Sequence, residues 1–153
     1  MSRAGLLLAA LAVASALGAA CQTVDLGTPP ADINACRPSE AFFVQQIWPN
    51  VINKDYGGKK CTDSGCHDTI GRGRLAQIPN PQPALDPTMA PPLPLPADWE
   101  KNYRSATEVM NCSNVTASPL ILFPTAMVSH GGGMFFSGTS PEALLIQMWV
   151  MAP

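Results

Sequence analysis

The apolar positions of the chain follow helical spacing in three stretches, and the first of these begins after Ser39. There the apolar residues fall at positions i, i+1, i+4, i+5, i+8 and i+9 of a run: Phe43, Val44, Ile47, Trp48, Val51 and Ile52. Because this spacing forms a single stripe, it predicts a helix with Ser39 as its N-cap and one face in a core. Pro49 lies inside the stripe, so we expect a kink there or two short helices.

A second helix is predicted from Asp98 to about Asn111. Asp98 is the candidate N-cap, because its side-chain oxygen can accept a hydrogen bond from a free N–H of the first turn. The larger apolar residues of this stretch then lie roughly on one side of the helix: Trp99, Tyr103, Ala106 and Met110.

The last helix has the clearest start signal. Ser140 is the candidate N-cap, Pro141 suits the first turn, and Glu142 lies at the positive end of the helix dipole. Residues 143–151 are almost wholly apolar, which predicts that this helix is buried.

Residues 79–96 form a proline-rich stretch, PNPQPALDPTMAPPLPLP. Its prolines exclude a helix or a central strand. Two interpretations remain open: a peptide-recognition motif, or an extended loop that wraps on the domain through Leu85, Met89, Leu93 and Leu95. No alternating run elsewhere suggests a sheet, so the sequence predicts a small, mainly α-helical domain with a long proline-rich loop.

The N-terminus has the layout of a secretory signal. Residues 1–20 combine Arg3, an uncharged run rich in Ala and Leu, and small residues before Cys21. The apolar run is short for a membrane-spanning helix and has no polar face. We therefore expect a signal peptide over residues 1–20, a tether over 21–35 and one domain over 36–153.

The run Leu17-Gly-Ala-Ala-Cys21 resembles a bacterial lipobox, in which the cysteine is acylated and becomes the first mature residue. The resemblance implies a lipoprotein anchored at Cys21, on the periplasmic side or the outer surface of a bacterial membrane. A soluble periplasmic protein is the alternative. Both places allow disulfides to persist.

The composition narrows the classes of protein that fit. Only 13% of the 153 residues are charged, and the chain holds 16 prolines and 12 glycines. This balance excludes a coiled coil, a polybasic nucleic-acid binder and a highly charged disordered chain. The formal net charge of −2 indicates no anionic partner.

The string Cys61-Thr-Asp-Ser-Gly-Cys66-His67 carries the candidate chemistry. Two cysteines followed directly by histidine attach a c-type haem, usually with two residues between the cysteines. The thiols bond to the porphyrin vinyl groups, and the imidazole reaches the iron. Here the gap is four residues, and Gly65 would help the longer segment to turn. A local Cys61–Cys66 disulfide and a zinc site with a fourth ligand are the alternatives, although an exported chain without a second ligand pair disfavours zinc.

The second of the two histidines, His130, precedes Gly131, Gly132 and Gly133. Glycines let the backbone approach a flat ligand closely, so His130 is a candidate second iron ligand, with Met127 and Met134 as alternatives. If Cys21 is acylated and the motif holds haem, Cys36 and Cys112 remain as a disulfide pair.

Beyond the motif, the chain resembles the single-haem cytochrome c-like domains of bacterial lipoproteins of the planctomycete and myxobacterial type. The resemblance covers most of residues 40–153 except the proline-rich stretch. It depends on an ordered set of features: a stripe with Phe43, Ile47 and Pro49, the string CTDSGCH, Ser118-Pro-Leu-Ile-Leu122, Pro124, His130-Gly-Gly-Gly133 with Phe135 or Phe136, Ser140-Pro-Glu142, Trp149 and Ala152-Pro153.

This resemblance implies a cytochrome c-like helical fold around one covalent haem c. By position it makes Cys61 and Cys66 the thioether residues, His67 the proximal iron ligand and His130 the distal one. Separately, Arg72 and Arg74 follow the motif and could pair with haem propionates, since guanidinium groups suit carboxylates. A solvated loop is the alternative for these two arginines.

The resulting expectation is an exported cytochrome that transfers single electrons to a redox partner protein that the sequence does not identify. Electron transfer is favoured over catalysis, because both histidines serve as ligands and no nucleophile or acid–base pair remains. Two alternatives stay open: a haem-free, disulfide-stapled envelope or interaction module, and a haem enzyme or gas sensor in which His67 is the only protein ligand.

Overall fold

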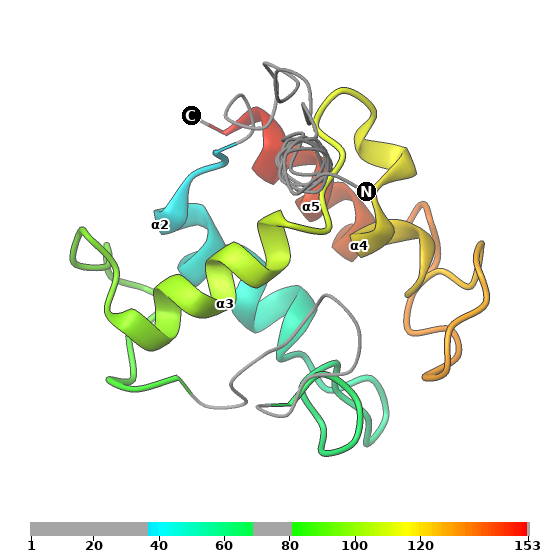
Figure 1. The fold of residues 1–153 in the computed structure, drawn as a ribbon, viewed down its shortest axis with the longest axis horizontal. Coiled ribbons are helices and arrows are strands. Elements are labelled where there is room, and N and C mark those ends of the chain that lie inside the picture. The colour runs from blue at the N-terminus through cyan, green and yellow to red at the C-terminus, as the bar shows by residue number, and fades with distance from the viewer. Residues whose placement is uncertain (1–36, 69–80, 153) are drawn as a thin grey trace, which may run out of the picture. The chain divides into compact units, whose positions relative to one another are not determined.

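The structure is a computed structural model that describes residues 37–68 and 81–152 (Figure 1). The chain divides into two compact units, Met1–Ala31 and Asp32–Pro153. The first unit lies outside the described residues, and so do the expected signal peptide, the acylation site Cys21 and the tether. The account below therefore concerns the second unit.

The expectation of a mainly α-helical domain is confirmed, because the described residues contain helices and no strand. In chain order the helices are α2 (Glu40–Phe42), η2 (Phe43–Ile52), α3 (Ala97–Thr107), η3 (Val115–Ala117), α4 (Pro119–Leu122) and α5 (Pro141–Met151) (Figure 1). In these parts of the chain, no helix is long and apolar enough to cross a membrane.

The first predicted helix forms with its whole apolar stripe buried. Ser39 is its N-cap and accepts a hydrogen bond from the Phe42 N–H. From Phe43 the helix widens into a π-helix, η2, in which the Asn53 N–H reaches the Trp48 carbonyl at 2.8 Å. The stretch therefore divides into two helices, as one form of the expectation had it, but the change of register falls at Phe43, and η2 continues through Pro49. The wider turns accommodate a proline that would disrupt an α-helix.

The second predicted helix, α3, begins one residue before Asp98 and ends earlier than expected. It begins at Ala97 after Pro96, and no side chain caps it, so Asp98 lies in the first turn and the predicted cap is wrong. The helix ends at Thr107, where the Val109 and Met110 N–H groups bond three residues back and tighten the chain into turns. Trp99, Tyr103 and Ala106 are buried as the stripe predicts.

The last helix, α5, begins as predicted but is buried on one side only. Ser140 accepts a hydrogen bond from the Ala143 N–H, and Pro141 occupies the first turn. One side of the helix is fully buried through Ala143, Ile146 and Trp149. A second stripe, at positions i, i+4 and i+7, is exposed: Leu144, Met148 and Met151. The prediction that this helix is buried therefore holds for one of its sides only.

The core is an aromatic cluster around Phe43. Its ring centre lies 5.4 Å from that of Trp149 and 5.7 Å from that of Tyr103, and the rings of Trp48 in η2 and Trp99 in α3 lie 6.1 and 6.4 Å from it. Two hydrogen bonds fasten the start of the described unit to this cluster: Tyr103 donates to the Pro38 carbonyl, and Trp149 donates to the Ser39 carbonyl. Aromatic side chains bury large areas in such clusters, so Phe43 joins η2, α3 and α5.

Residues 81–96 pass from the end of the gap to α3 without a helix or strand. Leu95 is buried and Leu85 is packed against the core, while Met89 and Leu93 are exposed. The Trp99 indole N–H donates to the Pro83 carbonyl at 2.9 Å.

Candidate functional site

A cavity of about 560 Å³ opens beside the end of η2. Val51 and Ile52 of η2 form one wall, Val109 and Leu120 form another, and Phe136 closes the base. Cavities of about 300–1,000 Å³ with mainly apolar walls are typical of small-molecule and cofactor sites. Three candidate residues from the sequence also line it: Cys61, His67 and His130.

His67 reaches the cavity from a tight turn. Its backbone N–H donates to the Cys61 carbonyl at 3.0 Å, and the Cys66 N–H donates to the Asp63 carbonyl at 2.9 Å. Gly65 has φ +82°, a conformation that favours glycine. The expectation that Gly65 turns the long gap is therefore confirmed, and the turn places Cys61 and His67 on the same cavity.

His130 lines the cavity from a different part of the chain, the loop between α4 and α5. Its Nδ1 lies 3.2 Å from the Gly133 carbonyl oxygen. A carbonyl oxygen only accepts, so Nδ1 carries the proton and Nε2 keeps its lone pair. A histidine held in this way presents Nε2 to a metal ion.

The two imidazoles face the same small space. Their ring centres are 6.1 Å apart and their planes are inclined by 14°. Two imidazoles on opposite sides of one metal ion have ring centres about 6 Å apart, because each metal–nitrogen bond is about 2 Å and each nitrogen lies about 1 Å from its ring centre. The observed separation of the ring centres is close to this value, and the rings are stacked.

Both motif cysteines are free thiols, so the local Cys61–Cys66 disulfide is not formed in the structure. Cys61 is buried in the cavity wall, and burial raises the pKa of its thiol to about 12. Cys66 is half-buried and is not among the residues that line the cavity. At neutral pH the Cys61 sulfur is thus a protonated thiol.

The methionines that flank His130 point elsewhere. Met127 and Met134 are exposed by 69% and 68%, and neither lines the cavity. Of the three candidate distal ligands, only His130 lies where it could meet a group held by His67.

The glycines after His130 shape the loop itself. A methyl group on Gly132 would lie 2.8 Å from the Phe135 ring and 3.2 Å from the His130 ring, and Gly133 has φ +75°. Gly131 lines the cavity. All three glycines were expected to allow close approach to a flat ligand. In the structure, Gly132 leaves room for the rings of Phe135 and His130. Gly133 forms the turn whose carbonyl oxygen accepts a hydrogen bond from His130 Nδ1.

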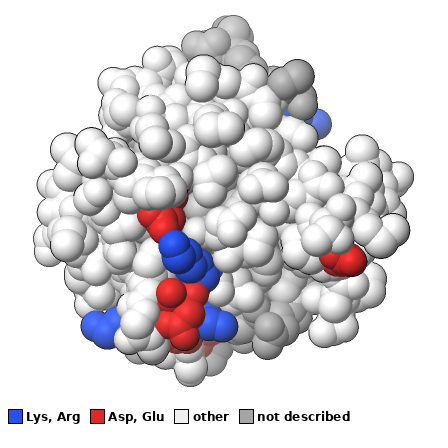
Figure 2. All heavy atoms as spheres, turned by 180° about the vertical axis from the view of Figure 1, so that it is seen from behind, with Lys and Arg blue, Asp and Glu red and all other residues white. Residues whose placement is uncertain are grey.

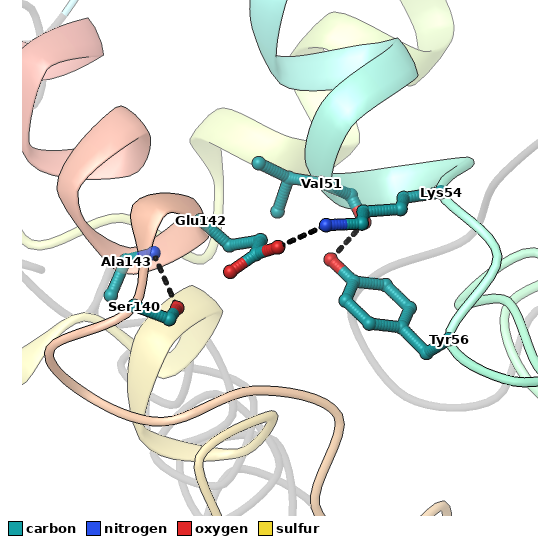
Figure 3. Close-up of polar contacts among 6 residues, drawn as sticks. All are labelled: Val51, Lys54, Tyr56, Ser140, Glu142 and Ala143. Atoms are coloured by element: carbon teal, nitrogen blue, oxygen red, sulfur yellow. Dashed lines mark hydrogen bonds and ion pairs between the residues drawn. The ribbon is translucent and has the colours of Figure 1, made fainter.

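A polar cluster lies between the end of η2 and the start of α5, as Figure 3 shows. Lys54 forms an ion pair with Glu142, and the Tyr56 hydroxyl donates to the Val51 carbonyl at 2.9 Å. Burial alone would raise the pKa of Glu142, but hydrogen bonds from Lys54 and Ser140 outweigh it and lower the pKa. Burial also raises the pKa of Tyr56. The cluster joins the end of η2 to the first turn of α5.

The cavity wall is nearly free of charge. Glu108 is the one Asp, Glu, Lys or Arg among the described residues that line it. Residues 109–141 contain no such side chain, and Glu142 is the only one in residues 109–153. In Figure 2, uncharged residues cover most of the face shown; most of the charged side chains form one group at the lower left, and the others lie apart at the right. The site therefore suits an apolar group rather than a free anion.

Several predicted site residues lie outside the described residues, namely Arg72, Arg74, Cys21 and Cys36. Cys112 is disulfide-bonded, and its predicted pairing with Cys36 stays a prediction. Within residues 37–68 and 81–152, no group of three or more His, Cys, Asp or Glu side chains is placed to hold a metal ion.

Sequence reasoning missed the residues that build the far wall of the cavity. It predicted no helix at α4, although Ser118-Pro119 repeats the Ser-Pro signal of Ser140-Pro141. It also gave Glu108, Lys54 and Tyr56 no role.

The chain matches no protein-family model, and no curated protein or solved structure is significantly similar to it.

Proposed function

We propose that the protein is an exported c-type cytochrome that binds one covalent haem and transfers single electrons in the cell envelope. The observation that carries the proposal is the cavity of about 560 Å³ that Cys61, His67 and His130 all line. The sequence motif and the resemblance point to this group independently of the cavity, which Cys61, His67 and His130 line and Cys66 does not.

The chemistry of the donor set fits a haem. A porphyrin already supplies four nitrogens to its iron, so the protein needs to supply only two axial ligands. His67 and His130 are two imidazoles whose ring centres lie 6.1 Å apart, and histidine is a common axial ligand. When bound, haem supplies an iron that changes oxidation state by one electron.

Covalent attachment would use only the cysteine thiols of the chain and the vinyl groups of the haem. A thiol adds across a vinyl double bond, its sulfur bonding to one carbon and its hydrogen passing to the other. Cys61 presents such a thiol from the cavity wall, and Cys66 lies beside His67 in the same turn. We assign both cysteines to the thioether bonds.

The remaining residues bind and shield the group. Val51, Leu120 and Phe136 form an apolar enclosure, which limits water near the iron and thereby tunes its potential. The Nδ1–H of His130 donates to the Gly133 carbonyl, which fixes the ring orientation. If His67 and His130 both bound the iron, they would leave no position on it for substrate, so electron transfer is favoured over catalysis.

The proposal includes a cytochrome c-like fold, a lipid anchor at Cys21, a Cys36–Cys112 disulfide and contacts of Arg72 and Arg74 with the propionates. The redox partner is a protein that we do not identify. The haem-free alternative requires a Cys61–Cys66 disulfide, and the free state of both thiols supports the haem proposal over it.

The first experiment is a pyridine haemochrome spectrum of full-length protein expressed with haem-maturation machinery, taken after acid–acetone extraction. We expect haem to stay with the chain and to give a c-type spectrum. No retained haem, together with a mass that shows Cys61 and Cys66 oxidised to each other, would refute the proposal in favour of the disulfide-stapled module.

Variants then assign the ligands. His67→Ala should prevent a stable low-spin haem, and His130→Ala should leave a covalent haem that becomes high-spin in the reduced state. Met134→Leu is the matched control on the same loop, because Met134 is exposed and outside the cavity. A low-spin spectrum that survives His130→Ala but not Met134→Leu would transfer the distal role to Met134.

A further inference from the structure

The two histidines are held in very different ways. Cys61 and Thr62, in the turn that carries His67, are buried, and the Thr62 hydroxyl donates to the Asn53 side chain at 3.1 Å. That turn is therefore fixed to the end of η2. Residues 126–134, which carry His130, include no buried residue.

The His130 loop is fastened only at its base. The Phe135 N–H donates to the Pro124 carbonyl at 2.8 Å, and the Val128 N–H donates to the Leu122 carbonyl at 3.2 Å. Phe136, just beyond, is buried. Segments with few buried contacts open at low free-energy cost, without unfolding of the core.

Hydrogen bonds within the tip of the loop hold its histidine. The Gly133 N–H donates to the His130 carbonyl at 2.9 Å, and His130 Nδ1 donates back to the Gly133 carbonyl. Ala126, at the start of the loop, has φ +57°, a conformation that is strained for alanine. Opening at the base would thus keep the tip bonds and relieve this strain.

The loop borders an apolar mouth. Phe123 and His130 line the cavity with ring centres 6.0 Å apart, and the exposed side chains beside them are uncharged: Met127, Val128 and Met134. A molecule that enters here meets no cation and no anion from this loop, so the mouth favours a small uncharged ligand.

We propose that the loop of residues 126–134 opens to withdraw His130 from the iron and admits a small uncharged iron ligand, such as carbon monoxide, to the vacated face. The inference depends on the proposed haem. It adds a second state to the proposed cytochrome, in which His67 alone holds the iron and a diffusible ligand takes the place of His130.

The test uses the reduced, haem-loaded full-length protein mixed with carbon monoxide over a range of concentrations. The observed rate should rise and then reach a plateau, because loop opening precedes ligand binding. His130→Ala should remove the plateau and make the rate linear in carbon monoxide. A linear rate in the unmodified protein, or no adduct at all, would overturn the inference.

Gly132→Ala tests the loop itself. The added methyl would lie 2.8 Å from the Phe135 ring, which crowds the closed state, so we expect the plateau rate to rise about tenfold, as overpacking of a contact does. Gly138→Ala is the matched control, because a methyl there meets nothing within 4 Å. Equal plateaus in the two variants would refute the role of the loop.

Amide hydrogen exchange on the same protein, without added ligand, gives an independent readout. The Phe135 amide should exchange faster than the His67 amide, since the first bond breaks on loop opening and the second lies in the fixed turn. The reverse order would overturn the inference. Haem that is lost on acid–acetone extraction would refute the proposed function itself, whereas retained haem that takes no carbon monoxide would refute only the loop inference.

Discussion

Single residues account for the geometry of the candidate site. His67 and His130 are 63 positions apart in the sequence, yet their rings lie 6.1 Å apart across the cavity. Gly65 makes the turn before the first, and Gly132 makes room beside the second. A motif of seven residues could predict His67, but only the folded chain shows which histidine or methionine faces it.

The partly buried Lys54–Glu142 ion pair yields a prediction on pH. The pKa of Glu142 is lowered from its ordinary value of 4.5, so its carboxylate stabilises the fold at neutral pH. That contribution is present above about pH 4.5 and is lost as the pH falls through the lower folded-state pKa. Glu142→Gln should therefore reduce the free energy of unfolding by about 1 kcal/mol at pH 7, and by less in acid.

Urea denaturation of both proteins between pH 3 and pH 7 measures the effect. Glu100→Gln is the matched control, because Glu100 pairs with the exposed Arg104 within one helix, an arrangement that contributes about 0.3–0.5 kcal/mol. A Glu142→Gln loss that is the same at pH 3 and pH 7 would contradict the assignment to the ionised carboxylate.

At the scale of the elements, start signals were more informative than composition. Ser39 and Ser140 cap their helices as predicted, because a cap is a local interaction between neighbours in the chain. Such local signals could not predict which residues of a helix are buried. The apolar run of α5 has no polar face, so its sequence does not indicate which side meets η2.

The two sides of α5 should respond differently to truncation. Ile146 is fully buried and Leu144 is 51% exposed, and both lie in the same helix. We expect Ile146→Ala to reduce the free energy of unfolding by about 2–5 kcal/mol, and Leu144→Ala by at most about 0.5 kcal/mol. Chemical denaturation of the two variants measures this, and equal losses would show that the exposed side is also packed in solution.

At the scale of the whole molecule, charge and cross-links are unevenly distributed. Residues 109–153 contain a single Asp, Glu, Lys or Arg, Glu142, and this part of the chain supplies Val109, Leu120, His130 and Phe136 to the cavity. The charged residues therefore lie mostly in the part before the site. Cys112, also in this region, is disulfide-bonded.

Removing the cross-link should destabilise the domain. Cys112→Ser should cost about 2–5 kcal/mol of unfolding free energy, since a disulfide that closes a long loop restricts the unfolded chain. If Cys36 is the partner, Cys36→Ser should cost the same, and the double variant should lose no more than either single one. Thermal or urea unfolding, together with a count of free thiols, measures both effects.

Cys21→Ser is the control, because an acylated Cys21 takes no part in the disulfide. A loss for Cys21→Ser that equals the loss for Cys112→Ser, with no loss for Cys36→Ser, would contradict both the Cys36–Cys112 pairing and the acylation of Cys21.

The sequence alone determined the helical character of the domain, the starts of its first and last helices and the turn at Gly65, because each depends on residues a few positions apart. Tertiary structure decided the rest. The register change at Phe43, the single buried side of α5 and the convergence of Cys61, His67 and His130 all depend on which surfaces meet. Burial is a property of contacts between distant segments, and a hydrophobic pattern specifies that a face will be covered without specifying what covers it.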